Sequence, residues 1–76
     1  MSQYQSWAAF ERQVIGECES VAVDSGAYFY EDTGCLCIPA PEPVARAIYH
    51  RLSRTHGLGS VKINGPVEGE YLIDFV

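Results

Sequence analysis

The chain has little positive charge. Five lysines and arginines stand against ten aspartates and glutamates, so the net charge is -5 with both histidines neutral. A protein with this balance repels phosphate overall, and we do not expect it to bind nucleic acid through its net charge. With 76 residues the chain is short enough for one small domain, spanning residues 1–76. Such a chain buries only ~60% of its unfolded surface, so its core must be small.

The chain lacks an even set of cysteines: its three cysteines are an odd number, which a framework of paired disulfides does not favour. Cys35 and Cys37 lie two residues apart in a segment typical of a strand, where a disulfide between them would be strained. We therefore expect reduced thiols. A basic start followed by an apolar stretch is missing, and no apolar run approaches the ~20 residues that cross a bilayer. The expectation is a soluble cytoplasmic protein with no membrane partner.

Arrangements of residues that carry chemistry are few. The side chains that could bind a metal or act as nucleophiles are the thiols and imidazoles of Cys18, Cys35, Cys37, His50 and His56. Structural zinc sites usually combine two C-x₂₋₄-C pairs, and a second pair is missing here. Glu31 and Asp32 are adjacent and point to different sides, which does not suit paired acid–base work. We expect no catalytic residue, metal, cofactor or small-molecule substrate, with a small Cys/His metal or thiol module as the alternative.

Helical and strand patterns alternate along the chain. Apolar residues at helical spacing predict a helix from Gln3 to about Cys18, with Ser2 and Gln5 as a capping pair. Pro43 suits the first turn of a second helix, which runs to His56 and stops at Gly57. Strands are predicted over Ser20–Asp24, Ala27–Glu31, Cys35–Ile38, Ser60–Asn64 and Glu70–Val76, with hairpin loops at Glu31–Gly34 and Gly65–Gly69.

These elements predict an α+β fold of order α-β-β-β-α-β-β. Two helices pack on one face of a four- or five-stranded, mostly antiparallel sheet, and each half of the chain is a helix followed by a hairpin. In the second helix, one side is apolar and is formed by Val44, Ala45, Ile48 and Leu52. The opposite side carries Arg46, His50, Ser53 and Arg54.

Alternation along each strand separates a core face from an outward face. The side chains expected to point inward are Val21, Val23, Phe29, Leu36, Ile38, Val61, Ile63, Tyr71, Ile73 and Phe75. The side chains of the other parity are Tyr28, Tyr30, Cys35, Cys37, Lys62, Glu70, Leu72 and Asp74. This second set is expected to be exposed, and its mixture of tyrosines and carboxylates favours a surface for a protein partner. The alternative is that the tyrosines only complete packing between strands.

Charge is segregated along the chain. Residues 1–43 hold seven acidic residues and one arginine, whereas residues 44–62 hold four basic residues and no acidic one. Clustered charge raises the local potential and speeds encounter with a surface of opposite sign. We therefore expect a non-enzymatic interaction protein that binds and inhibits a partner with a basic nucleic-acid-binding groove. The candidate partner-binding residues are Asp24, Tyr28, Tyr30, Glu31, Asp32, Glu68, Glu70 and Asp74.

In size, acidity and lack of a catalytic constellation, the chain resembles the small phage-borne anti-CRISPR inhibitor proteins. This resemblance covers overall character and carries no residue over. It implies a phage protein in a bacterial host cytoplasm that binds a CRISPR effector complex and acts as a DNA mimic. The competing hypothesis is a nucleic-acid-binding regulator that uses Arg46, His50 and Arg54 of the second helix. The chain is expected to be a monomer or a dimer, the latter if Glu70–Val76 forms an exposed edge strand.

Overall fold

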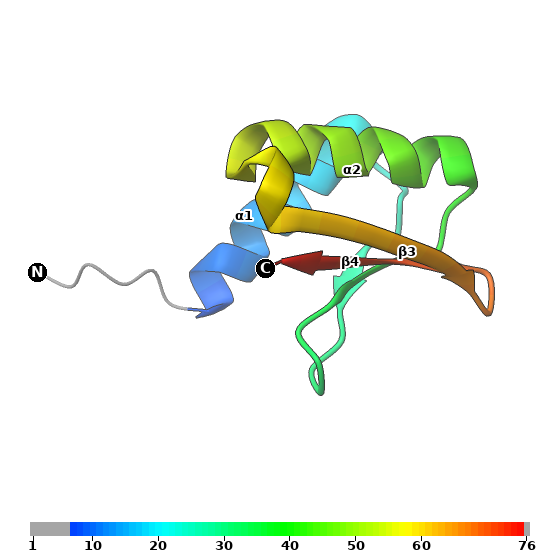
Figure 1. Cartoon of the computed structure of the whole chain (residues 1–76), viewed down its shortest axis with the longest axis horizontal. Coiled ribbons are helices and arrows are strands. Elements are labelled where there is room, and N and C mark those ends of the chain that lie inside the picture. Colours follow the sequence, from blue (N-terminus) through cyan, green and yellow to red (C-terminus); the bar gives the residue numbers. More distant parts are fainter. Residues whose placement is uncertain (1–6, 76) are drawn as a thin grey trace, which may run out of the picture.

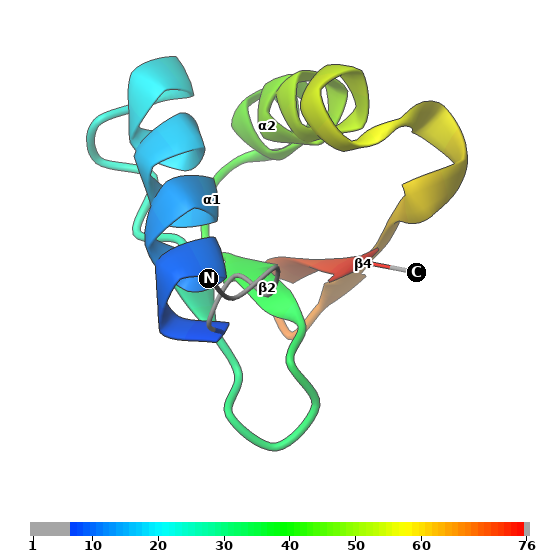
Figure 2. The same cartoon turned by 90° about the vertical axis from the view of Figure 1, so that its left-hand side faces the viewer.

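Two helices and four strands form the protein in the order α-β-β-α-β-β, which confirms the α+β class. The structure is a computed structural model, and it describes residues 7–75. The elements are α1 (Trp7–Val21), β1 (Tyr28–Phe29), β2 (Leu36–Ile38), α2 (Glu42–His56), the 3-10 turn η1 (Leu58–Ser60), β3 (Val61–Val67) and β4 (Glu70–Phe75). α2 lies over one face of the sheet, and α1 runs beside the sheet from the level of the strands up to α2, so that most of α1 is on the same side as α2 (Figures 1 and 2). Neither of these described helices is long and apolar enough to cross a membrane.

The four strands form one antiparallel sheet in the order β1-β2-β4-β3. β4 lies between β2 and β3, so the expectation that Glu70–Val76 forms an edge strand is wrong for the described part, Glu70–Phe75. The two hairpins meet because β2 pairs with β4 as well as with β1, with Leu36 opposite Ile73 and Ile38 opposite Tyr71. The edges of the sheet are therefore β1 and β3.

The strand expected over Ser20–Asp24 is not present. Ser20 and Val21 are the last residues of α1, and the Ala22 N–H still donates to the Cys18 carbonyl oxygen at 2.9 Å. The Ser20 hydroxyl donates to the carbonyl of Gly16 within the same helix. Val23, expected to point inward, is 86% exposed in the turn that follows. Only the two valines of this segment favour a strand, and two residues cannot outweigh a helix that is already extended by packing. The predicted helix start at Ser2 and Gln5 lies outside the described residues.

α2 begins and ends close to the predicted positions. Pro43 lies in its first turn, and the helix stops at Gly57, which has φ +98° and whose N–H donates to the Ser53 carbonyl at 2.8 Å. Ser53 was expected to point outward, but it is only 1% exposed. The buried stripe consists of Ala45, Ile48, Leu52 and Ser53. Ser53 is eight residues beyond Ala45, a spacing that keeps both residues on the core-facing side of an α-helix. The buried stripe of α2 therefore includes a polar residue as well as the apolar ones.

The second hairpin has a tighter turn than expected. β3 continues to Val67, which pairs with Glu70, so only Glu68 and Gly69 form the turn. Both have positive φ, at 52° and 83°, as a two-residue type I′ turn requires. The first hairpin turns over residues 31–34 as predicted, and the Tyr30 N–H donates to the Cys35 carbonyl at 2.8 Å across its base.

The core lies between the sheet and the two helices. Its fully buried side chains include Val14 and Cys18 from α1, Ile48 from α2, and Leu36 and Ile73 from the sheet. An aromatic cluster of Phe10, Phe29 and Phe75 closes the end of the core beside the start of α1. Except for Val23, every residue that was expected to point inward is buried or half-buried.

Val14 and Val23 allow a matched test of this packing. Val14→Ala should destabilise the protein by about 2 kcal/mol, because it removes two buried methyl groups and leaves a cavity. Val23→Ala should change the free energy of unfolding by less than about 0.5 kcal/mol, because Val23 is exposed. Urea unfolding followed by circular dichroism measures both values. Equal losses in the two variants would contradict the assignment of residues 22–24 to an exposed turn.

Candidate functional site

The face of the sheet opposite the helices carries the tyrosines and carboxylates. We call it the outer face, and it is formed by Tyr28, Tyr30, Cys35, Cys37, Lys62, Asn64, Glu70, Leu72 and Asp74. Direct pairing places Tyr28 opposite Cys37, Cys37 opposite Leu72, and Leu72 opposite Asn64, so one row crosses all four strands. Alternation directs these side chains away from the core, as predicted. Neither described helix covers this face (Figure 2).

The two tyrosines are half-exposed rather than covered. Tyr28 is 40% exposed and Tyr30 is 51% exposed. The Tyr28 hydroxyl donates to the Glu70 carboxylate, with Oη and Oε1 2.8 Å apart. This hydrogen bond is the main reason why the pKa of Tyr28 rises from 10.0 to about 12, since loss of the proton would place two negative charges side by side. The bond also fixes the position of the Glu70 carboxylate.

Asp74 is held in place on the same face. The Cys35 thiol donates to Asp74, with Sγ and Oδ1 2.8 Å apart, and the Asn64 amide donates to Oδ2 at 3.3 Å. The bond to the carboxylate raises the pKa of the Cys35 thiol.

Cys37 was expected to be exposed, but it is buried, because the larger side chains of its register neighbours Tyr28 and Leu72 flank it. Burial raises the pKa of Cys37 as well.

A shallow cavity of about 400 Å³ lies on the outer face. It is lined by Tyr28, Tyr30, Thr33, Cys35, Cys37, Val67, Glu68, Glu70 and Leu72. Val67 and Thr33 were not among the expected site residues. Val67 was missed because the sequence prediction placed it in the loop Gly65–Gly69. A β-branched valine next to the turn was the one signal that the strand continues to this position.

The structure brings together seven of the eight expected partner-binding residues. Tyr28, Tyr30, Glu68 and Glu70 line the cavity, and Asp74 lies on the same face. Glu31 and Asp32 are exposed in the hairpin that projects from β1 and β2, drawn in green at the bottom of Figure 2. We call the outer face together with Glu31, Asp32 and Glu68 the acidic surface. Asp24 does not belong to it, because the turn after α1 lies beside the helices (Figure 2).

The basic residues of α2 lie in the other layer. Arg46, His50 and Arg54 are all exposed, as predicted, and Arg46 pairs with Glu42 at 2.9 Å within the helix. The acidic surface has five carboxylates and one ammonium group, that of Lys62. The molecule therefore presents charges of opposite sign on α2 and on the outer side of the sheet. Further carboxylates on α1, at Glu11, Glu17 and Glu19, lie outside the acidic surface.

The cysteines and histidines of the alternative hypothesis are separated by the fold. Cys35 and Cys37 lie on the outer face, whereas His56 on α2 contacts the rings of Phe10 and Phe75 in the helix layer. Cys18 is buried in the core, and burial raises its pKa to about 11. Among residues 7–75 no group of three or more His, Cys, Asp or Glu side chains is arranged to hold a metal ion.

Comparisons of the chain with protein-family models, with curated proteins and with solved structures find no match.

The bond between Tyr28 and Glu70 predicts a pH dependence. Because the folded pKa of about 12 exceeds the ordinary 10.0, the bond contributes stability below pH 10 that is lost as the pH rises through about 12. Glu70→Gln should return the pKa of Tyr28 towards 10. Ultraviolet titration of tyrosinate measures this change, with circular dichroism at each pH to verify that the protein is folded. Tyr28→Phe should remove the same high-pH step, and its persistence in that variant would contradict the assignment.

The bond between Cys35 and Asp74 predicts a change in thiol reactivity. Alkylation requires the thiolate, so Asp74→Asn should lower the pKa of Cys35 and speed its alkylation several-fold at pH 8. Glu68→Gln, which removes a carboxylate without a bond to the thiol, is the matched control. Peptide mapping after a timed iodoacetamide pulse measures the rate at each cysteine. An unchanged rate at Cys35 in Asp74→Asn would show that the carboxylate does not restrain this thiol.

Proposed function

We propose that this protein is a non-enzymatic inhibitor that docks its acidic surface into the basic nucleic-acid-binding groove of a partner protein. The observation that carries the proposal is that two half-exposed tyrosines and hydrogen-bonded carboxylates lie together on one sheet face that neither described helix covers. The partner supplies lysines and arginines that otherwise contact phosphate. Bound inhibitor and nucleic acid then exclude each other, because both occupy the same cations.

The geometry of the face lowers the cost of binding. Tyrosine provides a large amphipathic contact area and loses little side-chain entropy, since it has two side-chain torsions. Glu70 and Asp74 are positioned by hydrogen bonds from Tyr28, Cys35 and Asn64 before a partner arrives. Carboxylates that are already ordered pay less conformational entropy on binding than free ones do. The exposed carboxylates of the hairpin extend the negative potential beyond the face and attract a cationic groove from a distance.

The resemblance to anti-CRISPR proteins determines which partner to test first. A CRISPR effector complex holds nucleic acid in a positively charged channel and must bind target DNA before it acts. In this proposal the protein works in the cytoplasm of a bacterial cell that carries a phage, as a monomer or a dimer, without a cofactor or a small-molecule substrate. The acidic surface acts as a DNA mimic within that channel.

Charge reversal tests the proposal. Asp32→Lys with Glu68→Lys should weaken inhibition of target-DNA binding by at least about tenfold, because two attractive contacts become repulsive. The control is Glu19→Lys with Asp24→Lys, which makes the same change in net charge at exposed positions outside the acidic surface. The control should stay within about twofold of the unaltered protein. Gel shifts of effector complexes with labelled target DNA, titrated with each protein, measure the inhibition.

Two results would overturn the proposal. One is that the unaltered protein neither binds a panel of effector complexes nor lowers their DNA binding. The other is that both charge-reversed proteins lose inhibition equally, which would make the net charge responsible and not the surface.

The exposed stripe of Arg46, His50 and Arg54 supports a second candidate, direct binding of nucleic acid through α2. That function predicts that Asp32→Lys with Glu68→Lys strengthens DNA binding by the protein itself. It also predicts a steep decrease of affinity with salt.

A further inference from the structure

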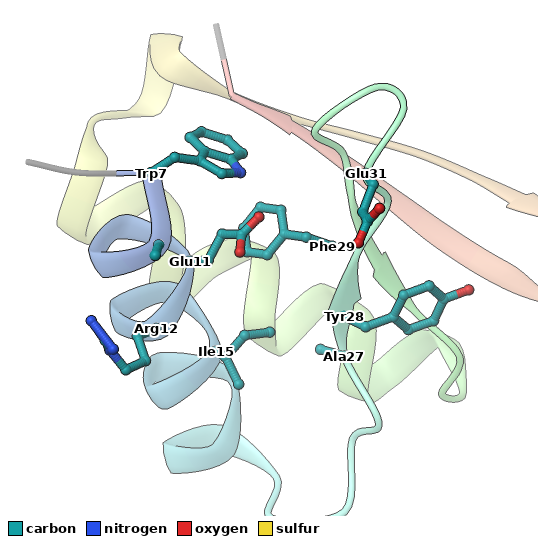
Figure 3. A pocket seen from close by; sticks show the side chains of 9 residues that line it. Trp7, Glu11, Arg12, Ile15, Ala27, Tyr28, Phe29 and Glu31 are labelled. Carbon is teal, nitrogen blue, oxygen red and sulfur yellow. The ribbon is translucent and has the colours of Figure 1, made fainter.

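A groove runs along the free edge of β1. Its volume is about 650 Å³, and it lies between α1 and the segment Ala27–Glu31 (Figure 3). The apolar lining includes Trp7, Ile15 and Phe29, and charged groups are provided by Glu11, Arg12 and Glu31. We call this the edge groove. Its lining comes from α1 and the segment Ala27–Glu31, and it shares only Tyr28 with the lining of the cavity on the outer face.

The backbone of β1 has hydrogen-bonding capacity towards this groove. The Tyr30 N–H donates to the Cys35 carbonyl, so Tyr30 and Tyr28 direct their backbone groups towards β2. Backbone groups alternate sides along a strand, and those of Phe29 therefore face the free edge. An unpaired strand edge is a template for one more strand. The other edge of the sheet is blunted, because Pro66 in β3 has no N–H to donate.

The side chains around the edge define what the added strand must carry. On the helix side, Trp7 is 54% exposed and its ring lies 5.7 Å from that of Phe29, which leaves an apolar surface for the strand. On the outer side, Tyr28 points away from α1 (Figure 3), and an arginine or lysine placed beside its ring gains a cation–π contact. An occupant with apolar and basic side chains in alternation satisfies both sides.

Charge at the groove favours the same occupant. Glu11 points from α1 towards Phe29, whereas Arg12 points away from β1 (Figure 3). Glu31 lies in the hairpin turn, two residues beyond the end of β1, so two carboxylates flank the groove. We propose that the edge groove binds an extended segment of a partner protein, in which apolar residues alternate with lysine or arginine, as an added strand beside β1. The inference does not depend on the proposed function, since binding of an extended segment at β1 can be tested with a peptide and without an effector complex.

A synthetic probe tests the groove directly. The probe is an acetylated heptapeptide in which four lysines alternate with three valines, and Trp7 is the reporter because it is the single tryptophan of the chain. Binding should shift the Trp7 emission to shorter wavelength and saturate with a Kd of roughly 10–100 μM. Amide resonances of Ala27–Glu31 should shift in the same titration. The glutamate–valine peptide of the same length should not bind.

Backbone methylation separates an added strand from a loosely held peptide. Two lysine–valine peptides are methylated at the odd or at the even amide nitrogens. Only alternate amides of an added strand face β1, so one methylated peptide should bind at least about tenfold more weakly and the other should retain its affinity. Equal binding of both peptides would overturn the proposal, as would the absence of any emission shift up to about 1 mM lysine–valine peptide.

A matched pair of variants tests the role of charge. Glu11→Lys should weaken binding of the lysine–valine peptide about five- to tenfold, whereas Glu19→Lys, on the same helix but outside the groove, should stay within about twofold. Equal weakening in both variants would show that only the net charge attracts the peptide, and it would overturn the proposal that the edge groove is the binding site.

Sedimentation equilibrium of the free protein tests whether a second copy of this chain occupies the groove instead. A dimer that the peptide dissociates would make a second copy of this chain the occupant, against the proposal.

Discussion

The register between β2 and β4 is the constraint on which the rest of this protein depends. It places Leu36 opposite Ile73 on the helix side and Cys37 opposite Leu72 on the outer side. Because side chains alternate with a period of two, a slip of one residue would move the apolar set out of the core and the carboxylates into it. Burial of the apolar side chains therefore fixes the composition of the outer face as well. The candidate site follows from the same pairing that builds the core.

Two hydrogen bonds on the outer face reinforce this pairing. Tyr28 and Glu70 are 42 residues apart in sequence, and Cys35 and Asp74 are 39 apart, so each bond joins the first hairpin to the second. Both bonds involve a carboxylate and are half-exposed or exposed, so each contributes modestly to stability. Their more important effect is on the surface itself. They hold the carboxylates of Glu70 and Asp74 in defined positions next to the exposed tyrosine rings. A carboxylate without such a bond would rotate freely and would have no fixed position.

Much of the fold follows from sequence patterns, and the exceptions have physical causes. The α2 boundaries, the first hairpin and the division of the strands into two faces were predictable, because proline, glycine and alternation are strong local signals. The segment Ser20–Asp24 was not, since β-branched residues at the end of a packed helix remain helical or form a turn. Ser53 and Cys37 were placed incorrectly because burial depends on the size of neighbouring side chains, which one strand or helix read alone does not reveal. The edge groove depends on where α1 lies relative to β1, and no local pattern specifies that distance.

The two candidate surfaces meet at β1, and this has a consequence for how a partner would be held. Tyr28 lies on the outer face and lines both cavities, while Phe29, the next residue, points into the edge groove. A strand added beside β1 would enlarge the outer face by one strand and place its basic side chains next to Tyr28 and the Glu31–Asp32 hairpin. A cationic partner that reaches both surfaces would then bind through two linked contacts, each of which raises the effective concentration at the other. The short β1 strand, which contributes only two residues to the sheet, would be the element that joins them.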